Sequence, residues 1–224
     1  MKAMGKFFGR VIPLSLAVLV LAAFSTGCAS APPPAAPAPK PQVRLGIDNV
    51  DKHLDVFAGK RVGLITNATG MNSNYESSID VLMAKTKLVA LFSPEHGIRG
   101  AVQAGDKVGS QTDAKTGLPV YSLYGDTKKP TPAMLENVDV LAFDIQDVGA
   151  RPYTYIYTMA YAMQGAKENG KTFVVFDRPN PIGGVEVEGG LIKPGYESFV
   201  GMYPIPSRHG MTVGELAKFF NKEF

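Results

Sequence analysis

The fold is decided by residues 138–177, which read VDVLAFDIQDVGARPYTYIYTMAYAMQGAKENGKTFVVFD. The apolar runs at Val138–Asp144 and Thr172–Asp177 predict two buried strands. Between them, Tyr153–Asn169 has the length and composition of a helix, and Gly170 is suited to be its C′ residue. A strand, a helix and a second strand of this kind indicate a parallel βαβ unit.

The same alternation continues outward from this unit in both directions. Further strands are predicted at Arg61–Thr66, Leu88–Phe92 and Val120–Leu123. Further helices are predicted at Glu76–Ala84, Ala133–Glu136 and Thr212–Asn221, the last opened by a capping box of Thr212 and Glu215. The pattern predicts an α/β, Rossmann-like fold, with a mostly parallel sheet and helices on both faces.

The first 27 residues have the layout of a signal peptide. Lys2, Lys6 and Arg10 precede an apolar run at residues 11–24, and residues 1–27 contain no acidic residue. That run is shorter than the about 20 apolar residues of a permanent membrane span. The small residues at 25–27 lead into Cys28, as at the lipidation site of bacterial lipoproteins, although Ser25 stands where Leu is usual. Ordinary cleavage nearby, without a lipid, is the alternative.

The rest of the chain divides into a tether and one domain. Residues 28–44 are rich in Pro and Ala and predict an extended spacer of about 3 Å per residue. Residues 45–224 are long enough for one domain. We therefore expect an exported protein of the cell envelope, facing the periplasm and held to a membrane by a lipid on Cys28.

Charge and cysteine content exclude several kinds of binding site. The chain has 23 basic and 20 acidic residues, and the three basic residues of the signal peptide account for the excess. The remaining neutral chain predicts no nucleic-acid surface. Cys28 is the single cysteine, which excludes an internal disulfide and a cysteine-based metal site.

Motifs for nucleotides and metals are missing or misplaced. Residues 165–172 spell a phosphate-binding loop, but they follow a predicted helix and precede a strand, the reverse of the required order. The patterns GxGxxG and GxSxG do not occur, and the three histidines form no local metal-binding pair. We therefore expect no nucleotide, no metal and no cofactor.

Polar clusters follow four of the predicted strands. They are NATG at 67–70, SPEHG at 93–97, DIQD at 144–147 and DRPN at 177–180. Ligands of parallel sheets bind beyond the carboxyl ends of the strands, so these clusters predict a site at one edge of the sheet.

The carboxylates in these clusters suggest glycoside hydrolysis. Glu95 lies between a Pro and a Gly that predict a tight turn, and Asp144 and Asp147 leave another strand. Glycosidases use paired carboxylates, one of them kept protonated by desolvation. Capping of helices or pairing with Arg99, Arg151 and Arg178 is the alternative for each acid.

Four tyrosines follow Arg151 in this sequence. An aromatic ring near the start of the helix could stack on a sugar, so Tyr153 or Tyr155 is a candidate contact. Tyr157 and Tyr161 are expected to belong to the core.

Several long motifs resemble one family. They are GKRVGLITNATG, LVALFSPEHGIRG, TGLPVYSLYG, DRPNPIGG and FVGMYPIPSRHGMTVGELA. Over nearly all of Leu45–Phe224 the sequence is similar to the N-terminal domain of the NamZ-like exo-β-N-acetylmuramidases. The resemblance implies a Rossmann-like catalytic domain that releases N-acetylmuramic acid from the non-reducing ends of peptidoglycan fragments.

The resemblance also implies site residues. Glu95 is the leading catalytic candidate, and the other catalytic candidates are His96, Asp144 and Asp147. The substrate-binding candidates are Asn67, Gln146, Arg151, Tyr153, Tyr155, Arg178, Asn180, Arg208 and His209. A guanidinium suits the lactyl carboxylate of muramic acid, and Arg151 or Arg208 is the candidate for that contact.

Members of this family continue beyond the point at which this sequence stops, into a smaller second domain that forms part of the cleft. An alternative is therefore a lipoprotein that binds muropeptides without turning them over.

Overall fold

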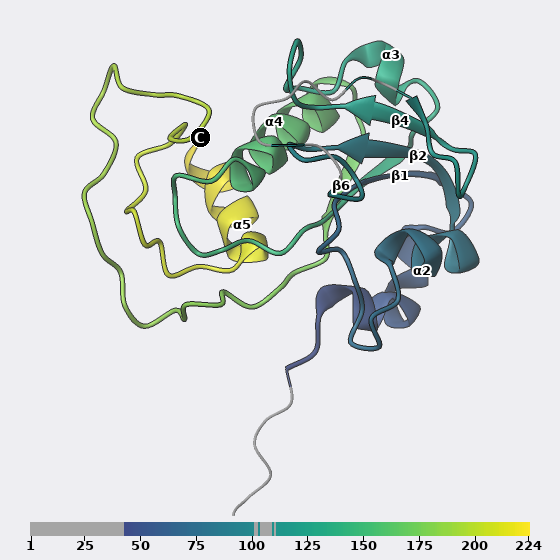
Figure 1. Cartoon of the computed structure of the whole chain (residues 1–224), viewed down its shortest axis with the longest axis horizontal. Coiled ribbons are helices and arrows are strands. Elements are labelled where there is room, and N and C mark those ends of the chain that lie inside the picture. Colours follow the sequence, from purple (N-terminus) through teal and green to yellow (C-terminus); the bar gives the residue numbers. More distant parts are fainter. Residues whose placement is uncertain (1–42, 101–102, 104–108, 110) are drawn as a thin grey trace, which may run out of the picture. The chain divides into compact units, whose positions relative to one another are not determined.

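The computed structural model of the chain describes residues 43–100, 103, 109 and 111–224 (Figure 1). The predicted signal peptide, Cys28 and the tether up to residue 42 lie outside the described residues. Among the described residues, no helix is long and apolar enough to cross a membrane.

A six-stranded sheet has the order β3-β4-β2-β1-β5-β6. Its strands are β1 (Arg61–Thr66), β2 (Lys87–Ser93), β3 (Gln111–Thr112), β4 (Pro119–Ser122), β5 (Val140–Asp144) and β6 (Thr172–Val175). All neighbours are parallel except β3 and β4, which confirms the predicted sheet type. After β4 the chain returns to β5 on the other side of β1. The strand order therefore reverses beside β1, where sheets of this kind form a ligand-binding crevice.

The helices are η1 (Gly46–Val56, a 3₁₀ helix), α2 (Ser78–Lys85), α3 (Pro132–Leu135), α4 (Tyr155–Glu168) and α5 (Val213–Glu223). The capping box of α5 is confirmed, since Thr212 accepts from the Glu215 amide and the Glu215 carboxylate accepts from the Thr212 amide. Gly170 has φ of +63° just after α4, as expected of a C′ glycine. Because α4 ends before β6 begins, residues 165–172 have the wrong order for a phosphate loop.

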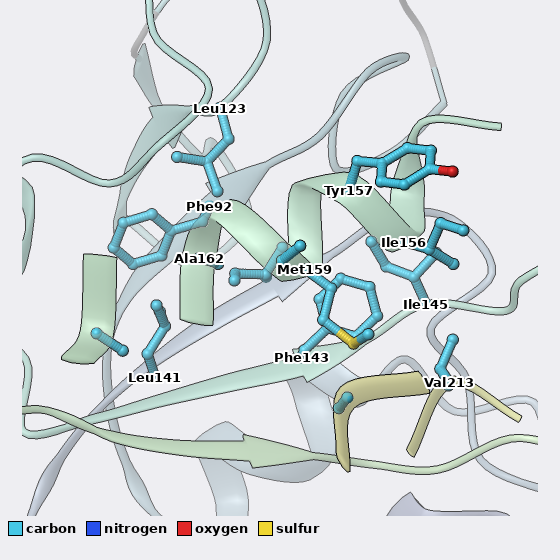
Figure 2. Packing of buried hydrophobic residues seen from close by; sticks show 14 of the residues in the cluster. Phe92, Leu123, Leu141, Phe143, Ile145, Ile156, Tyr157, Met159, Ala162 and Val213 are labelled. Carbon is cyan, nitrogen blue, oxygen red and sulfur yellow. The ribbon is translucent and has the colours of Figure 1, made fainter. Parts of the chain in front are cut away.

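Two apolar cores lie on opposite faces of the sheet. Side chains alternate along β5, so that Val140 and Ala142 join the core with η1 and α2, whereas Leu141 and Phe143 face α4 and α5. Figure 2 shows the second core, where Phe143 lies near Met159 of α4 and Val213 of α5. Burying a side chain of this size stabilises the fold by about 1.5–3 kcal/mol. The prediction of helices on both faces is confirmed.

Residues 176–212 connect β6 to α5 without forming a helix or a paired strand. In Figure 1 this segment is the long yellow-green loop beside α5. Its backbone touches the loop after β5 through an isolated bridge between Ala150 and Arg208. We call residues 176–212 the long segment.

Candidate active site

Glu95 lies in a tight turn directly after β2. The Gly97 amide donates a hydrogen bond of 3.1 Å to the Pro94 carbonyl, which closes the turn. His96, its third residue, has φ of +69°, a value that favours glycine or asparagine. Backbone strain of this kind costs about 1–3 kcal/mol and is concentrated at functional sites. The tight turn predicted from the Pro and Gly around Glu95 is confirmed.

The Glu95 carboxylate is half-buried and held by hydroxyl groups. Thr154, at the start of α4, donates its hydroxyl to Glu95 Oε2 at 2.8 Å. The Tyr124 hydroxyl, from the loop after β4, is also hydrogen-bonded to Glu95. Burial and this bond raise the pKa of Tyr124, which keeps the phenol a neutral donor. Sequence reasoning missed both residues; Tyr124 does lie in the quoted motif TGLPVYSLYG.

The loop after β1 contributes Asn67, which is hydrogen-bonded to Tyr155 of α4. Asn67 is buried, and its Oδ1 accepts hydrogen bonds from the Thr69 amide (2.9 Å) and hydroxyl (2.6 Å). The Tyr155 hydroxyl bonds to the Asn67 side chain; burial raises the pKa of Tyr155, and this bond opposes the rise. The Gln146 amide in turn donates to Thr69 Oγ1 at 3.0 Å. The loops after β1 and β5 and the start of α4 are thus connected, and the Glu95 charge also acts on Tyr155.

Asp144 has a different environment from Glu95. Its side chain is 0% exposed, and the Arg178 guanidinium donates to both carboxylate oxygens, at 2.6 and 3.0 Å. The Ser78 hydroxyl donates to Oδ2, and Arg178 also holds the Met71 carbonyl at 2.7 Å. Burial raises the pKa of Asp144, while the bonds from Arg178 and Ser78 oppose that rise. Asp144 and Arg178 thus form an enclosed ion pair, and the catalytic role of Asp144 and the substrate contact of Arg178 stay predictions.

Asp147 and His209 form a second buried pair. Their side chains are 7% and 0% exposed, and His209 Nε2 lies 3.3 Å from Asp147 Oδ2. The Gly149 amide also donates to this oxygen at 2.7 Å. The Met211 amide donates to His209 Nδ1 at 3.3 Å. The pair places the end of the long segment beside the loop after β5, although His209 Nε2 makes no hydrogen bond among the described residues.

Arg151 and Arg208 are bound to backbone carbonyls. Arg151 Nη1 donates to Gly190 (2.5 Å) and Ile205 (2.7 Å), and Arg208 Nη2 donates to Ile182 (2.5 Å). These bonds hold the long segment, which has no regular secondary structure of its own. A contact of either arginine with a substrate carboxylate stays a prediction.

Gln146 and Asn180 hold the same segment. Gln146 Nε2 donates to the Pro179 carbonyl at 2.9 Å, and Asn180 Nδ2 donates to the Met211 carbonyl at 3.0 Å. Amide groups used in this way fix the two ends of the long segment. Their contact with substrate stays a prediction.

Tyr157 has the predicted core position, whereas Tyr161, which was also expected in the core, is half-buried; the sugar contact of Tyr153 or Tyr155 stays a prediction. Tyr153 is 49% exposed in a turn before α4, which begins two residues later than predicted. Tyr155 is half-buried beside Asn67, Tyr157 is fully buried, and Tyr161 packs against Phe199 of the long segment. Within the described ranges, no three His, Cys, Asp or Glu side chains come together as ligands of a metal ion would.

The described geometry therefore centres on Glu95. A half-buried carboxylate that accepts hydrogen bonds from hydroxyl groups, at the carboxyl end of a parallel sheet, is suited to general acid-base chemistry.

Comparisons with known proteins identify the family of the chain. Residues 62–224 match the family described as exo-β-N-acetylmuramidase NamZ, N-terminal. The peptidoglycan β-N-acetylmuramidase NamZ of Bacillus subtilis (strain 168) is 63% identical over 190 residues, which cover 84% of this chain and 46% of that protein.

Two solved structures are also similar, both described as DUF1343 family proteins from Bacteroides fragilis NCTC 9343. One has a TM-score of 0.74 and 51% identity over 82% of this chain and 47% of its own. The other has a TM-score of 0.69 and 38% identity over 82% of this chain and 48% of its own. The chain thus spans about half the length of these relatives. With a family match over most of its described residues, the chain belongs to the NamZ N-terminal family of exo-β-N-acetylmuramidases.

Proposed function

We propose that the chain takes part in the hydrolysis of peptidoglycan fragments, releasing N-acetylmuramic acid from their non-reducing ends. The observation that carries this proposal is the half-buried Glu95 carboxylate, in its intact SPEHG turn, held by Thr154 and Tyr124. The B. subtilis relative named peptidoglycan β-N-acetylmuramidase supports the substrate class.

Glu95 would act as the group that exchanges a proton with the glycosidic oxygen or with the attacking water. Hydrolysis of a glycoside needs a proton for the leaving oxygen and assistance at the anomeric carbon. Asp144 is enclosed by Arg178 and Ser78, so we do not include it in the catalytic set. Tyr153, which is exposed near the start of α4, stays our candidate for stacking on the sugar ring.

A direct test uses the purified chain and a chromogenic β-glycoside of N-acetylmuramic acid. We expect turnover in the unaltered chain and a loss of about 10²–10⁴-fold in Glu95→Gln, the usual contribution of general acid-base catalysis. The matched β-glycoside of N-acetylglucosamine, which lacks the lactyl group, should be a poor substrate. Equal turnover by Glu95→Gln and the unaltered chain would contradict the proposal.

A second candidate function is binding of muropeptides without hydrolysis. It is favoured by the enclosure of Asp144 by Arg178 and Ser78, because glycosidases use paired carboxylates. Calorimetric titration with a muramic acid disaccharide separates the two functions, because binding without turnover supports the binding protein.

The proposed location is the cell envelope. The signal peptide would export the chain, a lipid on Cys28 would hold it to a membrane, and residues 29–42 would space the domain from that membrane. Labelling of cells with a fatty acid analogue tests this: label on the unaltered protein and none on Cys28→Ser supports the anchor. An unlabelled, exported protein would show ordinary cleavage instead.

A further inference from the structure

Thr154 stands at the N-cap of α4 but does not cap its own helix. Ser77, Thr131 and Thr212, the N-cap residues of α2, α3 and α5, each accept a hydrogen bond from a backbone amide of the helix that they begin. Thr154 makes no such bond and instead donates its hydroxyl to Glu95 Oε2 at 2.8 Å. A residue type suited to capping is used here to hold a side chain of another loop.

Tyr124 holds the same carboxylate from a different element. It lies in the loop after β4, whereas Thr154 begins α4, and both hydroxyls reach Glu95. A glutamate has three rotatable side-chain bonds, so a half-buried one samples several rotamers unless partners fix it. Two donors from separate elements restrict both the position and the plane of the carboxylate.

We infer that Thr154 and Tyr124 are positioning residues, which hold the Glu95 carboxylate in the orientation required for proton transfer. The inference deepens the proposed function and rests on it for its kinetic consequences. The two hydroxyls act through Glu95 and need not touch the substrate. Misplacement of a reacting group by about 1 Å can cost about 10²-fold in rate, so loss of either donor should be visible in kcat.

The kinetic test compares Thr154→Val with Thr158→Val. Thr158 lies one turn further along α4 and is fully buried, and its hydroxyl has no hydrogen-bond partner among the described residues, so it is a matched control. We expect Thr154→Val to lower kcat about 10- to 100-fold with little change in KM. Thr154→Ser should retain most activity, and Thr158→Val should match the unaltered chain. Thermal unfolding of each variant shows whether it is folded.

The Glu95→Gln background provides a second kinetic test. If Thr154 and Tyr124 act only through Glu95, Thr154→Val and Tyr124→Phe should lower turnover in the unaltered chain but add nothing to Glu95→Gln. A further loss in that background would overturn the inference, because the hydroxyls would then have a role of their own.

A spectroscopic test does not depend on turnover. The infrared carboxylate band of Glu95, obtained as the difference between each protein and its Glu95→Gln counterpart, should move in Thr154→Val and stay in place in Thr158→Val. A moved band with no turnover in the unaltered chain would refute the proposed function and support the positioning role. An unmoved band together with unaltered kcat in Thr154→Val would overturn the positioning role.

Discussion

Glu95 and Asp144 are carboxylates at the same edge of one sheet, yet their surroundings differ. Glu95 is half-buried in a strained turn and is held by the neutral hydroxyls of Thr154 and Tyr124. Asp144 is fully buried and paired with the Arg178 guanidinium. The buried ion pair is enclosed by its own partners, whereas the half-buried carboxylate keeps part of its surface exposed. Burial and hydrogen-bond partners, rather than residue type, distinguish the two acids.

The largest effect is expected on breaking the buried pair. Arg178→Met leaves the Asp144 carboxylate buried without its charged partner, which should lower the free energy of unfolding by about 3–5 kcal/mol. Urea unfolding followed by circular dichroism measures this change. Glu95→Gln is the control and should lie within about 0.5 kcal/mol of the unaltered chain. Equal stability of Arg178→Met and the unaltered chain would remove the distinction between the two acids.

A smaller effect is expected when both members of the pair become neutral. Asp144→Asn removes the buried charge at nearly constant shape, so the double variant Asp144→Asn/Arg178→Met should be more stable than Arg178→Met by about 1–3 kcal/mol. The four unfolding free energies of the double-mutant cycle give this coupling. A double variant less stable than Arg178→Met would show that Asp144 is needed for its bonds to Ser78 rather than for its charge.

The long segment is also held by polar bonds, and a change at Arg208 tests how much one of them contributes. The Arg208 guanidinium donates to the Ile182 carbonyl, and one hydrogen bond to a charged group contributes about 1.5–3 kcal/mol. Arg208→Met should therefore speed hydrogen exchange around residue 182 by at least about tenfold, with little change in β1 and β5. Lys129→Met, which breaks an exposed pair with Glu168, is the control and should leave exchange in this segment unchanged.

The smallest effect concerns a partly exposed pair, Asp139 with Arg61. The hydrogen bond from Arg61 holds the pKa of Asp139 well below its ordinary value of 3.8. The pair therefore stabilises the fold above that pH, and the contribution is lost as the pH falls below it, because the unfolded state binds the proton first. Asp139→Asn should make the loss of thermal stability below about pH 4 less steep. An unchanged slope would show that solvent screens the pair.

The sheet was largely predictable because its strands are apolar on both faces. The run Val138–Asp144 contains β5, and its alternate side chains fill two cores. The 3₁₀ helix η1 was missed, although Ile47 and Val50 are spaced as on one face of a helix and are buried. The two-residue strand β3 was missed because its pairing with β4 depends on tertiary structure and not on a local pattern.

The sequence by itself determined the α/β architecture, the capping of α5, the tight turn around Glu95 and the family to which the chain belongs. These depend on local patterns: runs of apolar residues, a Thr three residues before a Glu, and a Pro and a Gly around one acid.

Only the tertiary structure decided which polar residues reach Glu95 and which hold the long segment. Glu95 and Thr154 are 59 positions apart, and Asp144 and Arg178 are 34 apart. The physical reason is that burial and hydrogen-bond partners are set by how strands and helices pack. A sequence motif states that an Arg or an Asp is present, but not whether its charge faces a ligand, a backbone carbonyl or another charge.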